Sequence, residues 1–223
     1  VHPMPSREVH HGDGIEWLRG AALGPEHALV TSLPDVSELP RLDVLAWRSW
    51  FVDTVALACS RVAPRAVAIF YQTDIKHGGR WIDKGYLVHR GAEQAGLSCL
   101  WHKIVCRAPA GRTTYGRPAY GHWLAFSAEL ELPTGASTPD VLPELGTMTW
   151  ARAMPMSAAV ETCRFVVQQT ACRVVVDPFC GHGTILAVAN DHGLDAIGVE
   201  LSSKRVRKAQ ALRLERPAGG AQP

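Results

Sequence analysis

The sequence predicts an α/β fold in which a Rossmann-like sheet is flanked by helices. The clearest indication is an apolar run over 174–176, a turn with two glycines and a helix-forming segment from Thr184, which together predict strand, loop and helix. A second apolar segment, 196–199, ends in Glu200 and completes a βαβ unit. Because the acid that ends the second strand of such a unit accepts hydrogen bonds from ribose hydroxyls, we expect a nucleoside site at this turn.

Strands and helices alternate through the remainder of the chain. Apolar runs rich in β-branched residues predict strands, and apolar residues at three- and four-residue intervals, as at Val44, Trp47 and Phe51, predict helices. The expected strands cover 8–13, 28–31, 66–71, 97–105 and 123–127, the last strand of the sheet. The expected helices cover 14–19, 44–61, 85–95, 157–170 and 202–214. We expect loops at 72–84 and 107–122, and a surface linker at 130–145.

Size and composition suit one globular domain. The chain has 223 residues, 47% of them hydrophobic, and we expect a single domain over 1–216 and a disordered tail over 217–223. The net charge is only +2, so nucleic-acid binding requires a local basic patch. No apolar run reaches membrane-spanning length, and the six cysteines form no C-x-x-C pair. We therefore expect a cytoplasmic protein with reduced thiols and no metal; the oligomeric state stays open, with a homodimer as one option.

Two cofactor classes compete for the glycine turn. A dinucleotide fingerprint requires a third glycine where this chain has Leu186, which weakens the NAD interpretation. The motif DPFxGxGT at 177–184, followed by a Gly-x-Glu strand end, instead resembles the S-adenosylmethionine (SAM) site of amino-group DNA methyltransferases and their RNA-modifying relatives. The resemblance implies that Asp177 orients the amino-acid end of SAM and that Glu200 holds its ribose. The cofactor-binding residues implied at the turn are Asp177, Phe179, Gly181, Gly183, Thr184 and Glu200.

Two further segments extend the resemblance on the cofactor side. Gly12-Asp13, after the first expected strand, is similar to the segment whose acid faces the adenine of SAM, although these residues also suit an ordinary turn and helix cap. Trp150 lies in the segment before the glycine turn. By the resemblance it would cover the methionine end of SAM; the alternative is a core tryptophan.

The strand end at 32–35 resembles the target motif of the same family. Amino-methyltransferases have Asp, Asn or Ser, then Pro-Pro, then an aromatic residue; Ser32 and Pro34 match, whereas Leu33 and Asp35 depart from the pattern. In the family, the polar side chain and the following carbonyl accept hydrogen bonds from the target amino group, and the aromatic ring stacks on the extruded base. The resemblance therefore implies that Ser32, Pro34 and Asp35 are the catalytic residues that face the target.

The departure at Asp35 affects the expected base contacts. Stacking is worth about 1–3 kcal/mol per base, so another ring would have to replace the missing one. Four aromatic side chains could do so: Trp47, Trp50, Tyr71 and Trp81. Asp35 itself could accept a proton or hydrogen-bond a different group.

Two loops combine basic and aromatic residues, as binding of single-stranded nucleic acid requires. The first, 72–84, follows an expected strand, and the second, 107–122, is rich in glycine and proline. The substrate-binding candidates in them are Lys76, Arg80, Trp81, Arg112, Tyr115 and Arg117, with Lys84 as a further basic residue. A solvated loop and an ordinary hairpin excursion are the simpler alternatives.

The target motif precedes the SAM turn in this chain, an order that resembles the circularly permuted group of amino-methyltransferases. A circular permutation requires the last helix to meet the first strand. The linker at 130–145 leaves little room for the recognition region that DNA methyltransferases have there, so we expect a SAM-dependent methyltransferase that acts on tRNA or rRNA, recognised by shape. The alternatives are an N6-adenine or N4-cytosine DNA methyltransferase and a non-catalytic SAM-fold subunit that binds RNA or protein.

Overall fold

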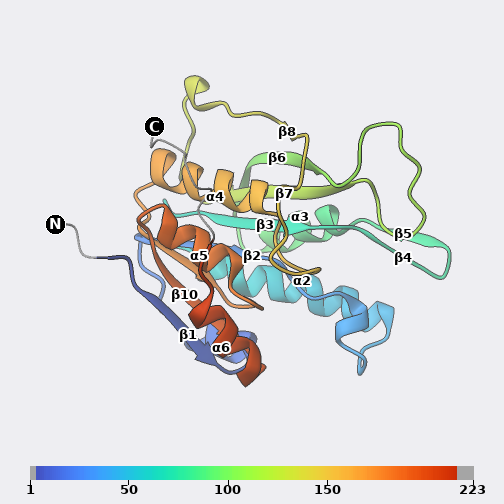
Figure 1. The fold of residues 1–223 in the computed structure, drawn as a ribbon, viewed down its shortest axis with the longest axis horizontal. Helices are drawn as coiled ribbons and strands as arrows, with labels where there is room; N and C mark the ends of the chain where they lie inside the picture. Colours follow the sequence, from blue (N-terminus) through green and yellow to red (C-terminus); the bar gives the residue numbers. More distant parts are fainter. Residues whose placement is uncertain (1–3, 215–223) are drawn as a thin grey trace.

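The computed structural model describes residues 4–214, and within them eight strands form one mixed sheet (Figure 1). Their order across the sheet is β1-β10-β9-β2-β3-β7-β6-β8. In this order the strands cover Arg7–His11, Asp195–Glu200, Val174–Asp177, His27–Thr31, Ala68–Gln72, Tyr120–Ser127, Ser98–Cys106 and Val141–Leu142. The five strands from β1 to β3 are parallel, and β7 is antiparallel to both of its neighbours.

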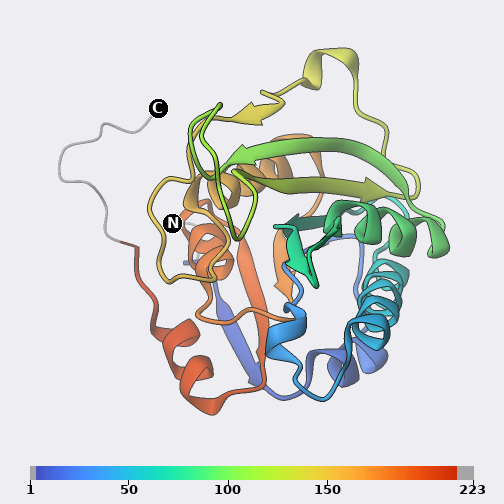
Figure 2. The same ribbon diagram turned by 90° about the vertical axis from the view of Figure 1, so that its right-hand side faces the viewer.

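Helices cover both faces of the sheet, which confirms the predicted α/β fold (Figure 2). On one face α1, α2 and α3 pack on a core that includes Trp47 and Phe70. On the other face α4, α5 and α6 pack on a core that includes Phe165 and Leu186. The helices cover, in order, Gly14–Gly20, Val44–Ser60, Lys84–Gln94, Met156–Gln169, Thr184–Asp191 and Ser203–Ala211.

The structure differs from the prediction in the segments expected to be loops. The 72–84 segment contains a hairpin of β4 (Ile75–His77) and β5 (Arg80–Ile82), because Gly78 and Gly79 both adopt the positive φ of a two-residue turn. The 130–145 segment contains a short 3-10 helix, η2 (Thr134–Ala136), and β8, which pairs with β6.

The predictions for strand β7 and helix α6 also differ from the structure. Strand β7, expected to be the last strand of the sheet, begins at Tyr120 and lies in the sheet interior between β3 and β6. Helix α6 ends at Ala211, short of the predicted 214. The tail expected over 217–223 lies outside the described residues.

The last helix contacts the first strand, as the permuted motif order requires. The Arg7 guanidinium donates to the carbonyl oxygens of Ala209 at 3.0 Å and of Leu212 at 2.7 Å. In the opposite direction, the Gln210 side chain donates to the Arg7 carbonyl at 2.7 Å. The prediction that the last helix meets the first strand is confirmed.

The parallel strands place their carboxyl ends along one edge of the sheet. The chain leaves β9 towards β10 on one side and leaves β2 towards β3 on the other, so β9 and β2 flank a switch point in strand order. Open α/β sheets bind ligands outside the strand ends at such a point. None of the helices found within 4–214 has the length and apolar character needed to cross a membrane.

Candidate active site

A cavity of about 300 Å³ lies outside the carboxyl ends of β1, β2, β9 and β10. Segments that are distant in the chain contribute its walls, including the 150–154 segment and Trp50 of α2. Among the side chains predicted to bind cofactor or target, those in the lining are Asp13, Ser32, Pro34, Trp150, Asp177, Phe179, Gly181, Thr184 and Glu200. We call this space the first cavity. It gathers most of the cofactor-binding residues predicted from the sequence.

Asp177 ends β9 and is buried at the floor of the first cavity. Its Oδ1 accepts hydrogen bonds from the Thr31 hydroxyl at 2.6 Å and from the Phe179 backbone N–H at 3.0 Å. Both donors are neutral, and burial raises the pKa of Asp177 to about 7. A cationic ligand group beside this carboxylate would therefore stabilise its charged form.

Glu200 and Asp13 lie at the ends of neighbouring strands on the same cavity. One Glu200 oxygen, Oε1, accepts the Ser202 backbone N–H at 2.8 Å, which fixes the carboxylate at the strand end. Asp13 caps helix α1, because its Oδ1 accepts the N–H groups of Ile15 at 2.8 Å and Glu16 at 3.1 Å. Asp13 is thus both a helix cap and a cavity residue, so the two sequence interpretations are compatible.

The two glycines of the turn have different surroundings. Gly181 lines the first cavity at φ +55°, and a Cβ on it would lie 2.9 Å from the Trp150 ring. Gly183 was predicted to let the backbone approach the cofactor, but it does not belong to the described lining. It adopts φ +80° at the start of α5, and a Cβ on it would lie 2.8 Å from the Ala209 Cβ on α6. Its requirement for glycine comes from the positive φ and from the packing of α6.

Trp150 covers one side of the first cavity. Its ring stacks on His182 with centroids 4.3 Å apart, and the Arg205 guanidinium lies 5.5 Å from its ring centroid. The indole is therefore held between two side chains near the cavity wall, and it is not a core tryptophan. Arg152, Met154 and Arg205 also line the first cavity and were not among the predicted site residues.

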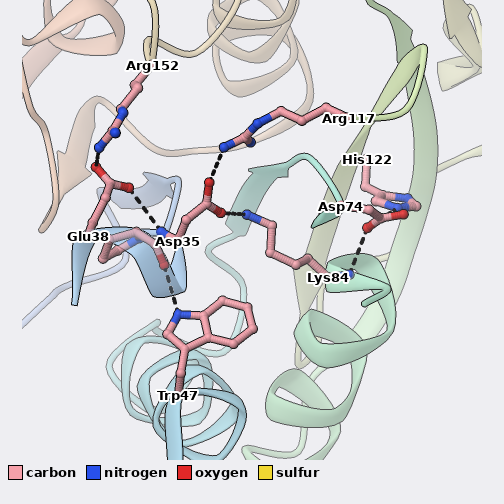
Figure 3. A network of polar contacts seen from close by, with 9 residues as sticks. Asp35, Glu38, Trp47, Asp74, Lys84, Arg117, His122 and Arg152 are labelled. Atoms are coloured by element: carbon pink, nitrogen blue, oxygen red, sulfur yellow. Dashed lines mark hydrogen bonds and ion pairs between the residues drawn. The ribbon is translucent and has the colours of Figure 1, made fainter. Parts of the chain in front are cut away.

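A second cavity of about 270 Å³ adjoins the first. The two share part of their lining, including Ser32 and Leu33, so the target motif separates them. Asp35 lines the second cavity, where it forms ion pairs with Lys84 and Arg117 (Figure 3). Burial alone would raise the pKa of Asp35, but the Lys84 ammonium and the Arg117 guanidinium together hold it below its ordinary value. This environment disfavours Asp35 as a proton acceptor.

Lys84 is only 2% exposed and lines the second cavity, so it does not lie on an exposed basic loop as expected. The lysine begins helix α3, and its backbone N–H donates to Asp74 Oδ1 at 2.8 Å. Asp74 also accepts from the Trp81 indole at 3.1 Å and bonds His122 at 2.9 Å. Asp83 lies within 4.8 Å of Asp74 and His122, a group that could hold a metal ion, and the predicted absence of a metal stays untested.

The predicted substrate-binding residues lie on the hairpin and on the loop between β6 and β7. Trp81 is 46% exposed with the Lys76 ammonium 5.2 Å from its ring centroid, and Tyr115 is 88% exposed. Arg80 and Arg112 are also exposed. Of the six candidates, Arg117 is the one that lines a cavity, since the others are in neither lining. Figure 1 shows both segments extending on the same side of the sheet.

The alternative rings for base stacking lie in different places. Trp47 is fully buried, and its indole donates to the Pro34 carbonyl at 3.2 Å, so it supports the target motif from below. Trp50 lines the first cavity, and Trp81 lies outside both. Tyr71 is the one of the four that lines the second cavity.

Comparison with known proteins supports the resemblance to SAM-dependent amino-methyltransferases that the sequence motifs predict. Residues 163–211 match the N6_N4_Mtase family model, which describes DNA methylases. The fold is that of the SAM-dependent methyltransferases, and the predicted resemblance to their N6/N4 amino-methylating family is confirmed. No curated protein matches the sequence of the chain.

Several solved structures share the fold. A proposed DNA modification methylase from Thermus thermophilus, solved with SAM, aligns with a TM-score of 0.69 and 20% identity over 92% of each chain. PvuII DNA methyltransferase, which is cytosine-N4-specific, aligns with a TM-score of 0.69 and 14% identity over 96% of this chain and 89% of that one. The M1.HpyAVI–SAM complex aligns with a TM-score of 0.58 and 12% identity over 91% of this chain and 96% of that one.

These comparisons favour the DNA alternative over the expected preference for RNA. That expectation depended on the short linker at 130–145. The alignments span 92%, 96% and 89% of the matched chains, so the chain aligns with nearly the whole of proteins whose names describe DNA methylation.

Proposed function

We propose that this protein is a SAM-dependent methyltransferase that methylates the exocyclic amino group of adenine or cytosine in DNA. The observation that carries the proposal is the shared wall of the two cavities. Ser32 and Leu33 line both. A methyl donor in the first cavity and a target base in the second would therefore meet at the target motif.

The first cavity has the chemistry that SAM requires. Asp177 offers a buried carboxylate to the ammonium of the amino-acid end, and Glu200 offers a fixed carboxylate to the ribose hydroxyls. Asp13 lies beside the expected adenine position, and Phe179, Thr184, Gly181 and Trp150 complete the walls. The acidic groups at separate points of the lining match the cationic and hydroxyl groups of the cofactor.

When bound, SAM supplies a methyl carbon on a sulfonium: the amino nitrogen forms a bond to that carbon, the carbon–sulfur bond breaks with its electron pair staying on sulfur, and the nitrogen releases one proton to water. The protein contributes alignment and polar contacts. Ser32 Oγ is buried without a protein partner in the part of the chain that the structure describes, so it is available to the target amino group. Trp47 holds the Pro34 carbonyl and thereby the loop that positions Ser32.

Calorimetric titration of SAM into the wild type and into Asp177→Asn tests the cofactor site. The wild type should bind SAM, and the variant should lose at least tenfold in affinity because it lacks the carboxylate. The variant should unfold at a higher temperature than the wild type at pH 8, because it avoids a buried charge, and this gain should shrink steadily as the pH falls from 7 towards 4. Loss of binding would then not reflect unfolding. The control variant is Arg65→Ala, because Arg65 is exposed and precedes β3 in the chain.

Transfer of tritiated methyl groups from SAM to unmethylated genomic DNA, tRNA and rRNA tests the substrate. We expect label in DNA, recovered as a methylated adenine or cytosine nucleoside. Label in RNA alone would contradict the DNA assignment and support an RNA substrate, as the short 130–145 segment led us to expect. A protein that binds SAM and labels none of the three would support the non-catalytic alternative.

A further inference from the structure

The second cavity contains hydrogen-bonding groups that the protein leaves unused. Among the described residues, Ser32 Oγ, Tyr71 Oη and Gln72 Nε2 are buried without a partner, and all three residues belong to the lining of this cavity. Tyr71 is 5% exposed and Gln72 is 2% exposed. Leaving a buried donor or acceptor unpaired costs about 1–3 kcal/mol. Three such groups around one cavity indicate that a ligand pairs with them.

Neighbouring residues hold Tyr71 in its position. Tyr71 and Gln72 end strand β3, and Gly121 lies on the adjacent strand β7. A Cβ on Gly121 would lie 2.5 Å from the Tyr71 hydroxyl oxygen. The glycine therefore leaves the space that the phenol occupies, and a larger residue at 121 would displace the phenol from the cavity wall.

Charged groups replace the aromatic residue on the opposite wall. Asp35 is fixed by Lys84 and by Arg117, which reaches it from the loop between β6 and β7 (Figure 3). Arg107 also lines the cavity. A base in this cavity would meet a fixed ion-pair cluster at position 35, and the ring of Tyr71 is the aromatic surface in the lining.

We propose that Gln72 and Tyr71 recognise the target base in the second cavity by hydrogen bonds, in place of stacking on a residue at position 35. The inference rests on the proposed function. In adenine and cytosine, the exocyclic amino group neighbours a ring nitrogen that accepts hydrogen bonds. With the amino group at Ser32, the Gln72 amide donates to that ring nitrogen, and the Tyr71 hydroxyl contacts another polar edge of the base. Thymine presents an N–H donor there and is disfavoured. Flipped bases are read in this way along their Watson–Crick edge.

Two variants test the proposal on the full chain, Gln72→Leu and Tyr71→Phe. Each removes a donor while keeping most of the side-chain volume. The matched control is Ser157→Ala, because Ser157 Oγ is likewise buried and unpartnered among the described residues but lies in neither cavity lining. The measurements are the SAM dissociation constant by calorimetry, the melting temperature, and kcat/KM for tritium transfer to unmethylated genomic DNA.

We expect Gln72→Leu to lower kcat/KM for DNA at least tenfold and Tyr71→Phe to lower it about threefold, with SAM affinity within twofold of wild type. Ser157→Ala should leave SAM affinity and kcat/KM unchanged and should not lower the melting temperature, because it removes an unpaired buried hydroxyl. Wild-type transfer rates in both cavity variants would overturn the inference and leave the proposed function standing.

The other outcomes separate the two proposals. If the wild type labels RNA in place of DNA, the DNA assignment fails, and the same loss in Gln72→Leu on RNA supports the cavity, since adenine and cytosine present the same edges there. If the wild type binds SAM but labels no nucleic acid, both proposals fail. A parallel loss of SAM affinity in the cavity variants, absent from Ser157→Ala, would also contradict a role confined to the target.

Discussion

At the scale of single residues, the candidate site contains two acids whose environments differ. Asp177 has neutral hydrogen-bond donors, and burial raises its pKa to about 7. Asp35 has two cations beside it, and they hold its pKa below the ordinary value although burial opposes them. A cationic ligand would stabilise the charged form of Asp177. Asp35 already has two cations as counter-charges and is a fixed part of the wall of the second cavity.

The raised pKa of Asp177 predicts how SAM affinity depends on pH. The ammonium of SAM requires the ionised carboxylate, and the ionised fraction falls as the pH drops through about 7. Because apparent affinity scales with the competent fraction, the dissociation constant should rise about tenfold between pH 8 and pH 6. Calorimetry over this range measures it. Glu200→Gln removes a carboxylate that helps to raise the Asp177 pKa, so it should show weaker binding and a loss of affinity that sets in at lower pH. A flat profile in the wild type would contradict the assignment.

The buried Lys84–Asp35 pair predicts a stability effect. Lys84→Met removes one of the two cations at Asp35 and leaves that carboxylate with the half-exposed Arg117. Breaking a buried pair is strongly destabilising, and we expect a loss of about 2–4 kcal/mol in the free energy of unfolding, measured by urea denaturation. Lys76→Met, at an exposed lysine, should change it by less than about 0.5 kcal/mol. Equal stability of the two variants would show that the pair contributes little.

At the scale of elements, the glycine turn joins β9 to α5 and also determines how closely α6 can approach. Gly183 adopts φ +80°, and a Cβ on it would lie only 2.8 Å from the Ala209 Cβ on α6. Gly193, after α5, adopts φ +77° with no atom within 4 Å of such a Cβ. The two glycines therefore share the backbone conformation and differ in packing.

This difference makes the two glycines a matched pair. Gly193→Ala should cost about 1 kcal/mol, because an L-residue is strained at positive φ. Gly183→Ala should cost at least about 2 kcal/mol more, since strain and overpacking add. Thermal unfolding of both variants measures the difference. If the two costs are equal, α6 moves away easily and its packing does not restrict position 183.

The β4–β5 hairpin predicts a salt-dependent contact with nucleic acid. Lys76 and Arg80 are exposed on it beside Trp81. If they contact phosphates, Lys76→Ala and Arg80→Ala should each weaken DNA binding at all sequences and reduce the slope of log K against log salt by about 1. Fluorescence anisotropy at several salt concentrations measures the slope. Arg65→Ala is again the control, and unchanged slopes would leave the hairpin as a solvated turn.

At the scale of the whole molecule, local features of the sequence predict the fold well. The 174–200 segment predicts its βαβ unit because strand, turn and helix depend on adjacent residues. The target cavity could not be predicted in the same way. Asp35 joins Lys84 and Arg117, which lie 49 and 82 positions away, so no local pattern indicates the cluster. Nor can a motif show whether a glycine faces a ligand or a helix, as Gly183 illustrates.

Short elements were missed for a related reason. Strand β8 has two residues, Val141–Leu142, and intrinsic propensity cannot specify so short a strand. Its segment is instead held by Lys103, which donates to the Thr138 carbonyl at 2.6 Å and to Asp140 Oδ1 at 2.9 Å. A contact between distant parts of the chain determines the strand, and the sequence alone shows only a linker.

The strand order also has a consequence for folding during synthesis. Strand β1 has β10 as its neighbour, and β10 reaches the rest of the sheet through β9, so β1 must wait for two strands that are synthesised much later. Until β9 and β10 leave the ribosome, β1 and one edge of β2 lack their partners, and pairing over such separations is slow. The cofactor cavity includes residues from the ends of β1, β9 and β10, so a nascent chain cannot bind SAM before β10 has been translated. Aggregation of incomplete chains is therefore the hazard that this order of segments creates.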